Sequence, residues 1–204
     1  MVLGKFDASL NDGILGFLPK SGRALAFPVY KSTFSRGDDY KPGMSFARPA
    51  MWREHLVLWS KDLGRTLDYL QGRKDVDNSK LAYFGFSWGA EIAPVLLAVD
   101  DRFRAAILMS GGIRLWAHSP QAEPVNFIRR VTIPVLMLNE RYDNIFPVET
   151  SQLPLYRLLG TPENDRKYVL YDTGHGMIPR KDLIRETLDW LDRYLGPVKR
   201  PPAS

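Results

Sequence analysis

A serine stands between two glycines in the pattern G-x-S-x-G at residues 85–89, whose sequence is GFSWG. This serine, Ser87, follows a short apolar run that predicts a buried strand over Leu81–Phe86, and it precedes a helical pattern over Ala90–Ala98. A sharp strand–turn–helix geometry lifts a serine hydroxyl clear of the backbone, and the two glycines of the motif permit so tight a turn. Ser87 is therefore the candidate nucleophile. The alternative interpretation is a serine without a catalytic role in a glycine-rich turn.

A serine hydroxyl is a weak nucleophile at neutral pH, so it needs a neighbouring base. The chain contains three histidines. His55 falls in a predicted surface helix and is expected to be structural, whereas His118 falls in an irregular segment and is the weaker candidate base. His175 follows the predicted strand Tyr168–Tyr171. A loop after a parallel strand opens at the same sheet edge as Ser87, so we predict that His175 is the base.

The base needs an acidic group to orient it. Asp143 follows the predicted strand Pro134–Leu138, so it falls on the same sheet edge as the serine and the histidine. Glu140, closer to the end of that strand, is the rival candidate. A surface carboxylate in an ion pair is the alternative interpretation for both. We predict that Asp143 is the acid.

These residues need a scaffold, and the apolar pattern predicts one. Helical periodicity covers four segments: Arg53–Gln71, Ala90–Ala98, Val148–Leu159 and Lys181–Leu195. Five short apolar runs predict buried strands: Ala24–Tyr30, Leu81–Phe86, Ala105–Met109, Pro134–Leu138 and Tyr168–Tyr171. Nearly continuous apolar strands that alternate with helices indicate an α/β fold, with a mostly parallel sheet covered by helices on both faces.

Three segments do not fit this alternation. Lys31–Arg48 is polar and glycine-rich and is expected to form a surface loop, and Ile113–Arg130 is expected to form a flap. The tail at residues 197–204 is expected to be disordered, which leaves a single domain over residues 1–196.

Composition excludes several classes of protein. The 204 residues include no cysteine, which excludes disulfide frameworks, zinc–thiolate sites and cysteine nucleophiles. The 28 Lys and Arg against 23 Asp and Glu give a net charge of +5, but the charges are interspersed and no nucleic-acid-binding motif accompanies them. The apolar runs are too short to span a bilayer, and no secretory signal is visible. We expect a cytoplasmic protein that binds neither nucleic acid nor membranes.

The chain resembles the α/β-hydrolase superfamily, and within it the bacterial dienelactone-hydrolase-like and acetyl-esterase-like serine esterases. It is especially similar to hydrolase domains that bacteria attach to larger proteins, including some Ser/Thr kinases. The resemblance runs from about Gly16 to Pro197. It is carried by FPVYK at residues 27–31, GFSWG at 85–89, PVL at 134–136, Asp143 with Pro147, and Gly174-His175. The serine, acid and histidine also follow one another in the superfamily's chain order.

The resemblance implies ester hydrolysis through an acyl-enzyme, with Ser87, Asp143 and His175 as nucleophile, acid and base and with no metal or cofactor. Dienelactone hydrolases proper carry cysteine at the nucleophile position, so the serine favours an ordinary carboxylesterase. Relatives with aspartate there, the haloalkane dehalogenases and epoxide hydrolases, are excluded.

The N-terminus departs from the family pattern. The family places one more strand before Ala24–Tyr30, followed by a loop that donates an N–H to the oxyanion hole. The roughly twenty residues before Ala24 lack that loop's motif, so we expect the N-terminal strands to be missing or replaced, as in a truncated chain. The backbone N–H of Trp88 is one expected oxyanion donor, and Tyr30 is a candidate for the second. An incomplete sheet edge also predicts a homodimer.

The sequence favours a serine carboxylesterase for short-chain acyl esters, because no insertion is long enough to form a large lid. Side chains expected to contact the small ester substrate lie near the carboxyl edge of the sheet: Trp116, Phe127, Ile145, Phe146 and Met177. A peptidase or thioesterase of the same superfamily, or a non-catalytic module of a larger protein, are the alternatives.

Overall fold

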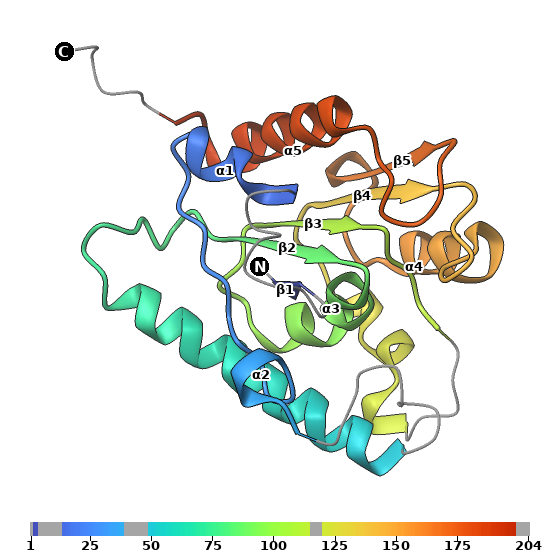
Figure 1. Ribbon diagram of the computed structural model, residues 1–204, viewed down its shortest axis with the longest axis horizontal. Helices are drawn as coiled ribbons and strands as arrows, with labels where there is room; N and C mark the ends of the chain where they lie inside the picture. Colours follow the sequence, from blue (N-terminus) through green and yellow to red (C-terminus); the bar gives the residue numbers. More distant parts are fainter. Residues whose placement is uncertain (1, 4–13, 39–48, 115–119, 199–204) are drawn as a thin grey trace.

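The computed structural model describes residues 2–3, 14–38, 49–114 and 120–198. Five parallel strands form one sheet in which the spatial order follows the chain order (Figure 1). The strands are β1 (Val2–Leu3), β2 (Ala82–Phe86), β3 (Ala105–Met109), β4 (Val135–Glu140) and β5 (Arg166–Tyr171). All five therefore present their carboxyl ends at one edge, as the sequence predicts for the last four.

Helices cover both faces of the sheet. The helices α1 (Phe17–Lys20) and α5 (Arg180–Leu195) lie on one face, and α2 (Pro49–Gln71), α3 (Trp88–Val99) and α4 (Leu153–Leu158) lie on the other (Figure 1). Strand β3 shows why both faces need cover. Its Ala106 and Leu108 pack with α2 and α3, whereas Ile107 and Met109 pack with α1 and α5. This confirms the predicted α/β architecture.

The long helices follow from their apolar spacing. In α2, Leu56, Trp59, Leu63 and Leu67 recur at intervals of three and four and are all buried. The helix begins at Pro49, four residues before the predicted start at Arg53, because proline is well tolerated in a first turn. Helix α5 begins after Pro179 and ends at Leu195; the next residue, Gly196, has a φ of 80°, which suits glycine after a helix end.

The prediction of a strand over Ala24–Tyr30 was wrong. Residues 23–30 form no strand, although Leu25 and Phe27 pack against the core on the α5 face. An apolar run becomes a strand only where a neighbour can pair with it. Here the position beside β2 belongs to β1, in which Leu3 is level with Phe86. A two-residue strand thus stands where the sequence predicts that a strand is missing or replaced.

The helix predicted over Val148–Leu159 is divided. A π-helical turn, η7 (Val148–Gln152), leads into α4, whose first turn contains Pro154. Proline has no N–H to donate to the preceding turn, so the regular pattern is interrupted there.

The remaining segments are irregular or short. One 3₁₀ turn, η8 (Glu163–Asp165), precedes β5. The segment predicted as a flap contains the 3₁₀ turns η4 (Pro120–Ala122), η5 (Pro124–Asn126) and η6 (Ile128–Arg130). The segment predicted as a surface loop contains η2 (Phe34–Arg36). The remainder of that loop (39–48) and the end of the tail (199–204) lie outside the described residues.

Candidate active site

Ser87 occupies the single residue between β2 and α3. Its φ of 51° and ψ of −112° lie in a region that non-glycine residues rarely adopt, and such strain concentrates at functional sites. The Ser87 N–H donates to the carbonyl of Met109 on β3 at 2.9 Å, which fixes the turn to the sheet. A Cβ on Gly85 would lie 2.7 Å from the carbonyl of Gly89, so the first glycine of the motif is sterically required. The turn thus has the sharp geometry that its sequence predicts.

The side chains of Ser87, His175 and Asp143 form a continuous chain of hydrogen bonds. His175 Nε2 lies 2.9 Å from Ser87 Oγ, and His175 Nδ1 lies 2.8 Å from Asp143 Oδ2. An ionised carboxylate only accepts hydrogen bonds, so Nδ1 carries the proton and Nε2 is left free to accept from the serine hydroxyl. This tautomer allows the histidine to take the serine proton.

Asp143 is held by its own loop. Its second oxygen, Oδ1, accepts the backbone N–H groups of Ile145 at 2.8 Å and Phe146 at 3.0 Å. Its side chain is fully buried, whereas that of His175 remains 18% exposed. The carboxylate is therefore fixed in one orientation while the imidazole stays open on one side.

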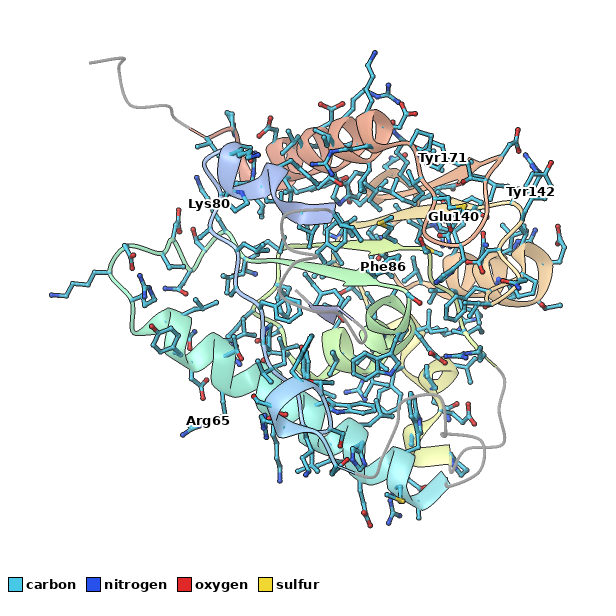
Figure 2. All side chains as sticks on the ribbon, in the orientation of Figure 1. Arg65, Lys80, Phe86, Glu140, Tyr142 and Tyr171 are labelled. Carbon is cyan, nitrogen blue, oxygen red and sulfur yellow. The ribbon has the colours of Figure 1, made fainter. Side chains whose placement is uncertain are left out.

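Two phenyl rings flank the imidazole. The ring of Phe86 stacks on His175 with centroids 5.9 Å apart, and the ring of Phe146 lies 6.0 Å away. Figure 2 shows Phe86 and Glu140 at the same end of the sheet, where β2 and β4 finish. The carboxyl edge of the sheet therefore gathers the site, as predicted.

The rival acid, Glu140, does not form the bond to the histidine that Asp143 forms. It is the last residue of β4 and is completely buried. Its Oε1 accepts the hydroxyl of Ser110 at 2.5 Å and the N–H of Gly176 at 3.1 Å. Burial raises its pKa to about 7; the Ser110 hydrogen bond opposes the shift, and the charge of Asp143 adds to it.

Glu140, Asp143 and His175 are close enough to raise the question of a metal ion. One potential ligand atom from each lies within 4.8 Å of the other two. Both ring nitrogens of His175 are already hydrogen-bonded, to Ser87 and to Asp143. The cluster therefore suits proton sharing better than metal binding.

The structure places the two expected oxyanion residues in different surroundings. The N–H of Trp88 is the first of α3, where no preceding helical turn supplies an acceptor. The hydroxyl of Tyr30 is buried, without a hydrogen-bond partner among the described residues, and its ring packs 6.2 Å from the indole of Trp88. The N–H of Lys31 donates to Asp62 at 2.7 Å and is therefore already engaged.

The expected substrate-contacting side chains do not form one group. Ile145 and Met177 are 42% and 69% exposed on the two loops that carry the acid and the histidine. Phe146 is buried beside the imidazole, as described above. Phe127 packs against the core on the α2 and α3 face, and Trp116 lies outside the described residues.

An ion pair beside the site was not predicted. Glu91, in the first turn of α3, is 3% exposed, and the guanidinium of Arg114 binds both of its carboxylate oxygens. Burial raises the pKa of Glu91, and Arg114 opposes that shift. The same guanidinium lies 5.1 Å from the ring centroid of Phe146. The pair therefore supports a ring that contacts the histidine, and sequence spacing alone gives no sign of it.

Within the part of the chain that the structure describes, no helix has both the length and the apolar character that crossing a membrane requires.

A parallel sheet covered on both faces, with a strained serine between strand and helix, defines an α/β-hydrolase. The sequence pattern of the dienelactone hydrolase family matches residues 24–183, so the chain belongs to that family and is a hydrolase. No curated protein matches the sequence significantly.

Solved structures share the fold at low sequence identity. A cold-adapted esterase from an Arctic intertidal metagenomic library, in a PEG-bound complex, superposes with a TM-score of 0.74 at 21% identity, over 95% of this chain and 81% of the other. TT1662 from Thermus thermophilus gives 0.70 at 22% identity, over 95% and 88%. An acylaminoacyl peptidase from Pyrococcus horikoshii gives 0.62 at 16% identity, over 86% and 33%.

Proposed function

We propose that this hydrolase is a serine carboxylesterase that cleaves short-chain acyl esters through an acyl-enzyme. The observation that carries the proposal is the hydrogen-bonded chain from Ser87 through His175 to Asp143, built on a strained turn between β2 and α3. Membership of a hydrolase family and the esterase fold among the structural neighbours support it.

The geometry suits a two-step reaction. In the first step Ser87 Oγ bonds to the ester carbonyl carbon as its proton passes to His175 Nε2. The alcohol then leaves with that proton, which completes the acyl-enzyme. In the second step His175 takes a proton from water, the hydroxide attacks the acyl carbon, and the proton returns to Ser87 as the acid departs. Asp143 holds the tautomer and offsets the imidazolium charge in both steps.

The oxyanion of each tetrahedral intermediate needs hydrogen-bond donors. The N–H of Trp88 is suited to this role because it follows the nucleophile directly and begins a helix. Tyr30, the expected second donor, would have to move its buried hydroxyl towards the substrate, so we favour an oxyanion site that does not use this hydroxyl. Losing one such donor typically lowers turnover by about 10²–10³, so a single donor would still support measurable activity.

Small esters are favoured over long-chain lipids. Ile145 and Met177 offer exposed apolar contacts on the loops beside the histidine, and the sequence contains no insertion long enough for a large lid. The first measurement is hydrolysis of p-nitrophenyl acetate, butyrate and octanoate by the wild-type protein and by Ser87→Ala. Turnover that declines with acyl length and disappears in the variant is expected. Equal background rates for both proteins would overturn the proposal.

A peptidase or thioesterase is the second candidate, because an acylaminoacyl peptidase shares the fold. The same acyl-enzyme chemistry serves all three bonds, so only the leaving group distinguishes them. Parallel assays with an acyl p-nitroanilide and an acyl thioester therefore decide between them. A fluorophosphonate that labels wild-type protein but not Ser87→Ala would separate any of these enzymes from a non-catalytic module.

A further inference from the structure

Glu140 is a buried carboxylate that the proposed reaction does not use. Its Oε1 binds groups from two other segments, the Ser110 hydroxyl after β3 and the Gly176 N–H in the histidine loop. Its Oε2 is buried and has no hydrogen-bond partner among the described residues. A half-satisfied carboxylate is costly to bury, so its position beside the histidine needs an explanation.

The groups around Glu140 are ionisable. The carboxylate of Asp143 and the imidazole of His175 each place an atom within 4.8 Å of a Glu140 oxygen. The charge of Glu140 also acts on Tyr168 of the neighbouring strand β5, but the Tyr168 hydroxyl donates to Gln152, and burial raises its pKa to about 12 and keeps it neutral. Burial raises the pKa of Glu140 itself to about 7. Its charge therefore changes within the range where a histidine-dependent hydrolase works.

We propose that Glu140 is a positioning residue that acts through His175. It holds the histidine loop by accepting the Gly176 N–H, and in its ionised form it sets a second negative charge beside the imidazolium that forms during turnover. The inference rests on the proposed function, because an imidazolium forms only if His175 takes the serine proton.

The two roles of Glu140 respond differently to pH. Protonated Glu140 still accepts the Gly176 hydrogen bond, so the loop stays in place below neutral pH. Ionised Glu140 adds electrostatic stabilisation that is present only above its pKa of about 7. The variant Glu140→Gln has the shape of the protonated acid but never becomes charged. It should therefore equal the wild type at low pH and fall behind as the pH rises.

The test is the ratio of wild-type to Glu140→Gln kcat/KM for p-nitrophenyl acetate, measured from about pH 5.5 to about pH 9. We expect a ratio near one at the acidic end that rises to roughly tenfold, with its midpoint near neutrality, because unit charges this close interact strongly in a buried site. The exposed carboxylate Asp172 offers the matched control, and Asp172→Asn should change the rate by less than about twofold at every pH. A ratio that does not change with pH would overturn the proposal.

A second variant should shift the pH midpoint of this rate ratio while keeping the pH dependence itself. Ser110→Gly deletes the hydroxyl that stabilises ionised Glu140, and its φ of 50° suits glycine. The ratio of kcat/KM for Ser110→Gly to that for the Ser110→Gly, Glu140→Gln double variant should also rise with pH. The midpoint of that rise should lie at a higher pH than the midpoint for wild type against Glu140→Gln. An unchanged midpoint would show that Glu140 is not the titrating group.

A readout that does not require activity separates this proposal from the esterase proposal. The ring signals of His175 can be followed by NMR against pH in wild type and Glu140→Gln. Because a charge that appears beside the ring changes its signals, the wild type should show a change near neutral pH that Glu140→Gln lacks. Signals that respond to pH identically in both proteins would overturn the role of Glu140. An inactive wild type whose signals still differ from those of the variant would overturn the esterase proposal and leave the electrostatic effect of Glu140 on His175 in place.

Discussion

Replacing Asp143 with asparagine tests the proposed histidine tautomer directly. The backbone N–H groups of Ile145 and Phe146 both point at Oδ1, so the oxygen of an asparagine side chain must remain there. Its NH₂ group then faces His175 Nδ1, where Asp143 Oδ2 now accepts at 2.8 Å. Because an amide NH₂ only donates, Nδ1 must become the acceptor and the proton must move to Nε2. The histidine would then be unable to accept the proton of the serine.

The expected loss in kcat for Asp143→Asn is about 10⁴-fold, the size seen for the corresponding change in serine proteases, or about 5.4 kcal/mol of barrier. The fold should survive, because both backbone hydrogen bonds are retained. The assay is steady-state p-nitrophenyl acetate hydrolysis with the rate of fluorophosphonate labelling, supported by a thermal melt. Glu149→Gln, an exposed carboxylate on η7, is the control and should leave kcat unchanged.

A decrease of less than about tenfold in the folded Asp143→Asn protein would refute this reasoning. It would mean that Asp143 does not select the tautomer, or that Glu140 takes its place when Asp143 is neutral. Comparison with the Asp143→Asn, Glu140→Gln double variant separates these explanations, since only the second predicts a further large loss.

Three further changes test the surroundings of the site. Gly85→Ala forces a Cβ to within 2.7 Å of the Gly89 backbone. We expect the free energy of unfolding to fall by about 1–3 kcal/mol and the melting temperature to fall by about 2–4 °C per kcal/mol lost. Tyr30→Phe removes a buried hydroxyl without a described partner; we expect unchanged kinetics and equal or greater stability by urea unfolding. Arg114→Ala leaves the Glu91 carboxylate buried and unpaired, so the free energy of unfolding should fall by about 3–5 kcal/mol near neutral pH. Because burial raises the pKa of Glu91, the folded state binds the extra proton, and this loss should deepen from about pH 5 to about pH 8.

For each of these three changes, one outcome would contradict the prediction. Gly72→Ala is the control for the first, since its Cβ would meet only ordinary contacts at 3.5 Å, and equal melts for the two alanine variants would refute the steric argument. A large fall in kcat for Tyr30→Phe would instead support its hydroxyl as the second oxyanion donor. A loss of stability in Arg114→Ala that does not change with pH would show that Glu91 is not responsible.

The sequence predicts the meeting of Ser87, Asp143 and His175 because each follows an apolar run that becomes a parallel strand. The carboxyl ends of such strands share one edge, so position along the chain translates directly into position in space. The run Ala24–Tyr30 is just as apolar but forms no strand, although Leu25 and Phe27 pack against the core. Apolar composition indicates contact with the core, whereas strand pairing depends on which segment occupies the adjacent position in the sheet.

The supporting polar groups were harder to predict. Glutamate is rarely buried, so nothing in its type indicates that Glu140 lies inside. The predicted strand ends at Leu138, but β4 continues to Glu140 and carries its side chain into the site. The ion pair of Glu91 with Arg114 joins residues 23 positions apart, a spacing that no helical or strand periodicity selects.

Two serines show how much of the site depends on strand ends. Ser87 follows β2 and Ser110 follows β3, and both adopt positive φ, 51° and 50°. Each donates its N–H to the next strand in the sheet, to Met109 and to Leu138. This shared geometry turns one hydroxyl to the imidazole of the site and the other to its buried glutamate. Since strained backbone persists only where the surrounding structure enforces it, the second serine is best explained as part of the same functional arrangement as the first.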